Sequence, residues 1–74
     1  GQSVPATILE REFFYQRLET ELDEGGFLYP DHLAPTIKRN LRSMFNKTGL
    51  TQQEVKTLHG VVSALTEKKS KNRK

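Results

Sequence analysis

The chain has no cysteine and no tryptophan, and its 74 residues include only two histidines. Without cysteine there can be no disulfide, no thiolate metal site and no thiol nucleophile. Two histidines also argue against a structural zinc site, so we expect no metal. No apolar run approaches the roughly 18 residues that a membrane span needs, and no signal-peptide core follows the N-terminus. We therefore expect no membrane contact and a cytoplasmic location.

Apolar residues are scarce as well. They make up 34% of the chain, below the roughly 45–50% of typical globular domains. A chain this short rarely gains more than about 3–5 kcal/mol from its core alone. Its remaining sources of stability are tight helix packing, oligomerisation or attachment to a larger body, and we favour the last two.

Charge is divided unevenly along the chain. Residues 1–31 hold seven acidic and two basic side chains, whereas residues 32–74 hold ten basic and two acidic ones. The balances of −5 and +8 together give the net charge of +3. This asymmetry indicates one surface that repels polyanions and another that attracts them.

The clearest structural signal is a helix start at residue 51. Thr51 and Glu54 have the spacing of a capping box, in which each side chain accepts a hydrogen bond from a backbone amide at the other position. Leu50 and Val55 occupy the flanking positions of a hydrophobic staple. Apolar residues then recur at helical spacing: Val55, Leu58, Val62 and Leu65. The pattern predicts an amphipathic helix whose apolar side packs against a partner surface.

Two further helices are predicted upstream. The first runs from about Thr7 to Glu24 and ends at a glycine pair, of which Gly25 suits the left-handed position after a helix. The second has Pro35 in its first turn, where the missing amide costs nothing, and ends before Gly49. No sustained period-two alternation indicates a strand.

These patterns predict one small all-α domain, a short bundle of three helices of roughly 17, 11 and 16 residues. Whether it dimerises is left open. We expect residues 1–6 to be a linker or a remnant of cloning and residues 7–67 to form the three-helix domain. We expect residues 68–74 to form a basic, disordered tail.

Three small or aromatic residues predict packing against another helix, domain or subunit. Phe13, Phe14 and Tyr15 are consecutive and cannot all face one core, so at least one points elsewhere. Gly60 costs about 1 kcal/mol relative to Ala inside a helix, and close approach of another helix is the common compensation. With Ala64 it forms a small-residue patch that seats either the first helix or a second copy. We assign Phe13, Gly60 and Ala64 to dimer or domain packing.

The sequence offers little for catalysis. It has no glycine-rich phosphate loop and no Ser–His–acid pattern with a readable context. His59 lies beside the apolar stripe of the last helix, and we interpret it as a partly buried structural histidine because no second titrating group is visible nearby. His32 is interpreted as a capping or surface residue. No catalytic residue is predicted in this chain.

The strongest candidates for ligand binding are basic residues of the second helix, namely Lys38, Arg39, Arg42 and Lys47. Three of them lie within about one and a half turns and could meet successive phosphates. The alternative is a solvated helix face. No aromatic residue is interleaved with them, so they support phosphate contact and not base stacking. The lysine-rich tail adds non-specific affinity for polyanions.

Three segments carry a resemblance to a known family, and they occur in order: residues 14–19 with 26–28, residues 41–47, and residues 50–55 with 58–62. Their sequences are FYQRLE with GFL, LRSMFNK, and LTQQEV with LHGVV. Between residues 13 and 65 the chain thus resembles the C-terminal helical domain of TrmJ-like, SpoU-class (SPOUT) RNA 2′-O-methyltransferases.

The resemblance implies a non-catalytic accessory domain that assists dimerisation and RNA binding. The catalytic part would be a knotted N-terminal domain, outside this chain, which binds S-adenosylmethionine and methylates a ribose hydroxyl of tRNA or rRNA. This chain itself would bind no cofactor. Its partners would be tRNA or rRNA, its own catalytic domain and a second copy.

The family's phosphate-facing arginines map onto Arg42 and Lys47, and less directly onto Lys38 and Arg39. Ser43 and the pair Thr48-Gly49 replace positions that are often basic in the family, and His59 replaces an arginine. These departures put the strength of RNA binding in question.

Two other functions are compatible with the pattern. The first is a helical protein–protein dimerisation module that makes no contact with nucleic acid. The second is a helix-turn-helix DNA-binding domain, in which the third helix would read bases. That helix offers only Gln52, Gln53 and Lys56 near its start, which makes DNA readout the weakest of the interpretations.

Overall fold

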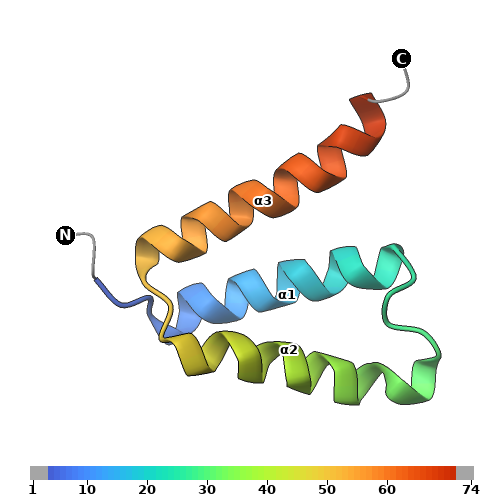
Figure 1. The fold of residues 1–74 in the computed structure, drawn as a ribbon, viewed down its shortest axis with the longest axis horizontal. Coiled ribbons are helices and arrows are strands. Elements are labelled where there is room, and N and C mark those ends of the chain that lie inside the picture. The colour runs from blue at the N-terminus through green and yellow to red at the C-terminus, as the bar shows by residue number, and fades with distance from the viewer. Residues whose placement is uncertain (1–3, 72–74) are drawn as a thin grey trace.

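The computed structural model describes the backbone of residues 4–71 and the side chains of residues 4–67. Its elements are α1 (Ile8–Glu24), a 3-10 turn η1 (Asp31–Leu33), α2 (Ala34–Thr48) and α3 (Gln52–Lys71) (Figure 1). Within the described part of the chain the only β-type pairing is an isolated bridge. The predicted all-α fold with three helices is therefore confirmed.

Helices α1 and α3 each begin with a capping box. Thr7 and Glu10 cap α1: the Thr7 amide donates to Glu10 Oε1 at 2.8 Å, and the Glu10 amide donates to Thr7 Oγ1 at 3.0 Å. Thr51 and Glu54 do the same before α3, at 3.0 and 3.1 Å. The predicted capping box at residue 51 is thus confirmed, and each box satisfies amides that have no partner within the helix.

Helix α1 ends at Glu24 as predicted, but the left-handed glycine is Gly26 and not Gly25. Gly25 keeps helical dihedrals, with φ −84°, whereas Gly26 has φ +83°. The amide of Phe27 donates to the carbonyl of Leu22 at 2.9 Å, and that of Gly26 to Asp23 at 3.1 Å. This pair of bonds is a Schellman motif, and it needs the second glycine in the left-handed position.

Helices α2 and α3 are longer than predicted. α2 spans 15 residues and ends at Thr48, and Gly49, with φ +64°, caps it. α3 spans 20 residues, so the backbone remains helical through the first four residues, 68–71, of the predicted tail. The rest of that tail lies outside the described residues.

The last residues of the predicted linker pack against the domain instead of leading away from it. The amide of Ala6 donates to the carbonyl of Leu50 at 3.0 Å, and the amide of Gln52 donates to the carbonyl of Val4 at 2.8 Å. Ala6 is buried. A short extended segment therefore ties the start of the chain to the connection between α2 and α3, and the sequence pattern did not reveal it because the segment is too short to show alternation.

The three helices lie side by side with α1 between α2 and α3 (Figure 1). The Cα positions extend 39 × 35 × 16 Å, so the domain is close to one layer of helices. Phe14 lies at the centre of the domain and is 1% exposed. The other buried members of the core cluster are Ala6, Tyr15, Leu50, Val55 and Val62, with Leu18, Phe45 and Leu58 packed against them.

A layer one helix thick cannot cover both sides of its central helix, and this leaves large apolar side chains exposed. Phe13 is 67% exposed while its neighbours Phe14 and Tyr15 are buried, as expected for three consecutive aromatic residues on a helix. Val61 and Leu65 of α3 are 48% and 63% exposed. Within residues 4–71, none of the helices combines the length and apolar character that a membrane span needs.

Candidate nucleic-acid interface

Arg39, Ser43 and Lys47 lie at successive turns of α2 and are all exposed. Their spacing of four residues places them on one stripe of the helix, which we call the solvent face of α2. Among the described residues, neither Arg39 nor Lys47 forms an ion pair. These two predicted phosphate-binding residues therefore keep their full charge for a ligand.

Arg42 follows Arg39 by three residues on α2, and its side chain reaches α1. Its Nε donates to Glu19 Oε2 at 2.7 Å, its Nη2 to Glu19 Oε1 at 3.2 Å, and its Nη1 to Glu12 Oε2 at 2.6 Å. The guanidinium carbon lies 5.2 Å from the ring centroid of Tyr15. The hydrogen bond to Glu19 is the main reason why the pKa of Arg42 is raised. Two carboxylates thus compensate its charge, and Arg42 joins the two helices.

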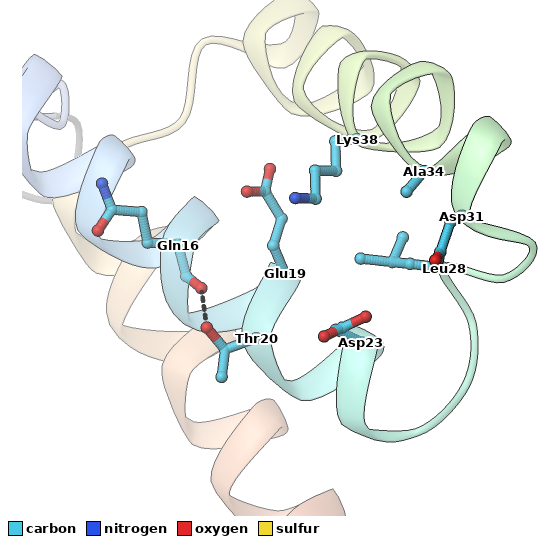
Figure 2. Close-up of a pocket in the computed structure, with 8 residues that line it drawn as sticks. All are labelled: Gln16, Glu19, Thr20, Asp23, Leu28, Asp31, Ala34 and Lys38. Atoms are coloured by element: carbon cyan, nitrogen blue, oxygen red, sulfur yellow. Dashed lines mark hydrogen bonds between the residues drawn. The ribbon is translucent and has the colours of Figure 1, made fainter.

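Lys38 faces a hollow between α1 and α2, which we call the acidic hollow (Figure 2). It has a volume of about 340 Å³, and three of its eight lining residues are carboxylates, namely Glu19, Asp23 and Asp31. Figure 2 shows the side chains of Glu19 and Lys38 pointing into the same space. Asp23 and Asp31 repel phosphate from this hollow, while Glu19 is already paired with Arg42, so Lys38 is poorly placed for RNA contact.

His59 belongs to a polar network between α1 and α3 that the sequence did not reveal. Arg17 Nη1 lies 3.0 Å from His59 Nδ1 and donates to the His59 carbonyl at 3.2 Å, while Nη2 donates to Ser63 Oγ at 2.7 Å. The ring of His59 also packs edge-on against Phe14, with centroids 5.4 Å apart. Burial, with a smaller contribution from Arg17, lowers the pKa of His59. The partly buried structural role predicted for this histidine is consistent with these contacts.

The three residues predicted to pack against another helix, domain or subunit are largely exposed. A Cβ atom added at Gly60 would meet nothing within 4 Å, and Ala64 is exposed. Phe13 contacts His59, with ring centroids 5.5 Å apart, but is otherwise exposed. Among the described residues no atom would lie within 4 Å of a Cβ at Gly60, so α1 does not fill the space beside this glycine. Contact with a second copy stays a prediction.

Two apolar hollows lie along α3, one against α2 and one against α1. The α2–α3 hollow, of about 380 Å³, is lined by Phe45, Thr48, Leu50, Glu54, Thr57 and Leu58. The α1–α3 hollow, of about 290 Å³, is lined by Leu18, Glu21, Leu22, Val62, Leu65 and Thr66. Exposed apolar hollows of this kind are typical of surfaces that another protein covers.

Histidine and acidic side chains are spread over the described part of the chain. No three side chains among His, Asp and Glu gather there to hold a metal ion. The imidazole of His59 is engaged by Arg17.

The fold defines the class: a small all-α domain made of one layer of three helices. Residues 9–74 match the family described as "tRNA methyltransferase TrmJ, C-terminal domain", and this match extends over most of the chain. The chain therefore belongs to the family of C-terminal domains of the TrmJ tRNA methyltransferases.

A solved structure supports the same assignment. The crystal structure of TrmJ from Z. mobilis ZM4 is 39% identical in sequence and superimposes with a TM-score of 0.80 over 86% of this chain. The chain spans 29% of the length of that protein. A comparison with curated protein sequences found no match. The family resemblance seen in the sequence is thus confirmed.

Proposed function

We propose that this chain is the non-catalytic accessory domain of an RNA 2′-O-methyltransferase and contacts tRNA, or rRNA, through the solvent face of α2. The exposed Arg39 and Lys47 are the observation that carries the proposal. Methyl transfer from S-adenosylmethionine would belong to a catalytic domain outside this chain. The cytoplasm, where tRNA is abundant, is the corresponding location.

The geometry of α2 separates two of the four predicted phosphate ligands, Arg39 and Lys47, from the others. Arg39 and Lys47 are eight residues apart, about 12 Å along the helix axis, and point away from the domain. Arg42 is held by Glu12 and Glu19, and recruiting it for phosphate would leave those carboxylates without their cation. The proposal therefore assigns RNA contact to Arg39 and Lys47 and a structural role to Arg42.

Two phosphate contacts predict modest and salt-dependent affinity. Each neutralised phosphate contributes roughly −0.7 to −0.9 to the slope of log K against log salt concentration. The solvent face of α2 should therefore account for a slope of about −1.5. Affinity of this size suits a domain that assists a larger enzyme in holding its RNA.

The test is a titration of fluorescently labelled tRNA with the chain at about 50 and about 200 mM salt. We expect Arg39→Gln/Lys47→Gln to weaken binding and reduce the salt slope. Lys47→Gln and Lys38→Gln form a matched pair, because each removes one charge from α2 while only Lys47 lies on the solvent face. Equal losses in the pair, or none in the double variant, would contradict the proposal.

A dimerisation module is the second candidate. The two apolar hollows along α3, together with exposed Val61 and Leu65, favour it. In an isologous dimer the same surface of each copy must carry both a protruding and a recessed part. The exposed side chains of Val61 and Leu65 of one copy could therefore enter the α2–α3 hollow of the other. Sedimentation equilibrium of the chain and of Leu65→Lys tests this. A concentration-independent monomer mass for the wild type would exclude it.

A further inference from the structure

We propose that a hollow beside Phe13, between the starts of α1 and α3, binds one unpaired nucleotide of an RNA. The Phe13 hollow is lined by Glu10, Phe13, Gln52, Val55, Lys56 and His59 and has a volume of about 300 Å³. This inference rests on the proposed RNA-binding function but concerns a different surface from Arg39 and Lys47. It adds base contact to a domain otherwise limited to phosphates.

One wall of the Phe13 hollow is aromatic. The ring of Phe13 is 67% exposed and lies against the ring of His59, with centroids 5.5 Å apart and planes tilted by 41°. His59 is in turn held by Phe14 and Arg17. A supported, exposed ring offers its face to a nucleobase, and stacking of this kind tolerates any base because every base has a π-face.

A hydrogen-bond donor is fixed in the same wall. Because a guanidinium group can only donate, the contact of Arg17 Nη1 with His59 Nδ1 makes Nδ1 the acceptor. The ring proton of a neutral His59 is then on Nε2, and no partner for Nε2 occurs among the described residues. Burial and Arg17 lower the pKa of His59, which keeps the ring neutral and this tautomer in place.

Glu10 adds a hydrogen-bond acceptor to the Phe13 hollow, and Lys56 adds a positive charge. The carboxylate of Glu10 caps α1, and its hydrogen bond with Thr7 lowers its pKa, so it remains ionised. Gln52 Nε2 is its neighbour, 3.2 Å from Oε2. Carboxylates accept hydrogen bonds from base amino groups, and exposed Lys56 can meet the attached phosphate.

Composition favours RNA over protein as the occupant. Four of the six residues that line the Phe13 hollow are polar or charged, compared with three of six in the α2–α3 hollow and two of six in the α1–α3 hollow. A small hollow with one aromatic wall and a few polar groups is typical of small-ligand sites. The acidic hollow is partly lined by Gln16 and Thr20, further along α1 than Phe13. Its carboxylates keep phosphates away from that part of α1.

The test uses a labelled single-stranded RNA of about eight nucleotides, and the same sequence as a duplex. We expect Phe13→Leu, which keeps an apolar side chain but loses the π-face, to weaken single-strand binding about tenfold. The matched control is Phe27→Leu, since Phe27 is 55% exposed in the turn after α1. Phe27→Leu should bind like wild type, and both variants should keep the wild-type Tm.

A second readout locates the base. In NMR spectra the ring protons of Phe13 and His59 should shift when the single strand is added, and much less with the duplex. Equal affinity of Phe13→Leu and Phe27→Leu would overturn the inference, even if Arg39→Gln/Lys47→Gln still weakens tRNA binding and the proposed function stands. A change in sedimenting mass on Phe13→Leu, with RNA affinity unaltered, would assign the hollow to a protein and also overturn it.

Discussion

Arg42 and Glu19 are joined by two hydrogen bonds, from Nε to Oε2 at 2.7 Å and from Nη2 to Oε1 at 3.2 Å. The paired geometry holds the guanidinium plane in one orientation, over the ring of Tyr15. Tyr15 in turn donates from its hydroxyl to Asn46 Oδ1 at 2.6 Å. Polar contacts therefore fix α2 against α1, in a domain with few buried apolar residues.

Removing this contact should destabilise the fold. We expect Arg42→Ala to lower the free energy of unfolding by about 1–2 kcal/mol, a moderate loss because the Arg42 side chain is 33% exposed. For a domain of this size the Tm should fall by roughly 5–15 °C. Arg39→Ala is the matched control and should change stability by less than about 0.5 kcal/mol. Thermal unfolding followed by circular dichroism measures both, and equal Tm values would contradict the role of Arg42.

The extended segment before α1 should contribute to stability as well. Ala6→Glu would place a charge where the side chain is 6% exposed, and we expect a loss of about 2 kcal/mol or more. Asn40→Glu introduces the same side chain at an exposed position of α2 and should be nearly neutral. Urea denaturation of the two variants gives the comparison. If Ala6→Glu is as stable as Asn40→Glu, residues 4–6 are only a linker.

Stability should fall in mildly acidic solution because of His59. Its pKa is lowered in the folded state, so the unfolded chain takes up the proton first as the pH decreases. The contribution of His59 is complete above the ordinary pKa of about 6.5 and is lost as the pH falls through the lowered pKa. We expect a smaller decrease in Tm over this window for His59→Gln. If the Tm of wild type and of His59→Gln fell equally with pH, Arg17 would not hold the imidazole of His59 in its neutral form.

Gly60 provides a test of the small-residue patch. Its surroundings are open, so Gly60→Ala should stabilise α3 by about 0.5–1 kcal/mol. Gly49→Ala should do the opposite by about 1–2 kcal/mol, because residue 49 has φ +64°. Chemical denaturation gives both values. A stabilised Gly60→Ala variant that also loses self-association would identify Gly60 as a dimer contact.

The sequence predicted the helices well because their signals are local. The capping box at Thr51 and Glu54, the glycines after α1 and the apolar spacing in α3 each involve residues a few positions apart. The segment Val4–Ala6 was missed because its hydrogen bonds go to residues 50 and 52, far along the chain.

The candidate site was predicted only in part, and for the same reason. Composition identified the basic residues of α2 but could not say which of them α1 neutralises. The contacts of Arg42 with Glu12 and Glu19 span 30 and 23 positions of sequence, and those of Arg17 with Ser63 span 46. No periodic pattern carries such pairs, so only the packing of the helices reveals them.

The most direct test of the account is an NMR titration of the isotopically labelled chain with a tRNA anticodon stem-loop. If the solvent face of α2 contacts RNA, the amide signals of Arg39, Ser43 and Lys47 should shift, and raising the salt concentration should reverse the shifts. Signals of Val61 and Leu65, on the apolar side of α3, should stay in place. Shifts confined to Val61 and Leu65, or no shifts at low salt, would contradict the assignment of this domain as an RNA-contacting one.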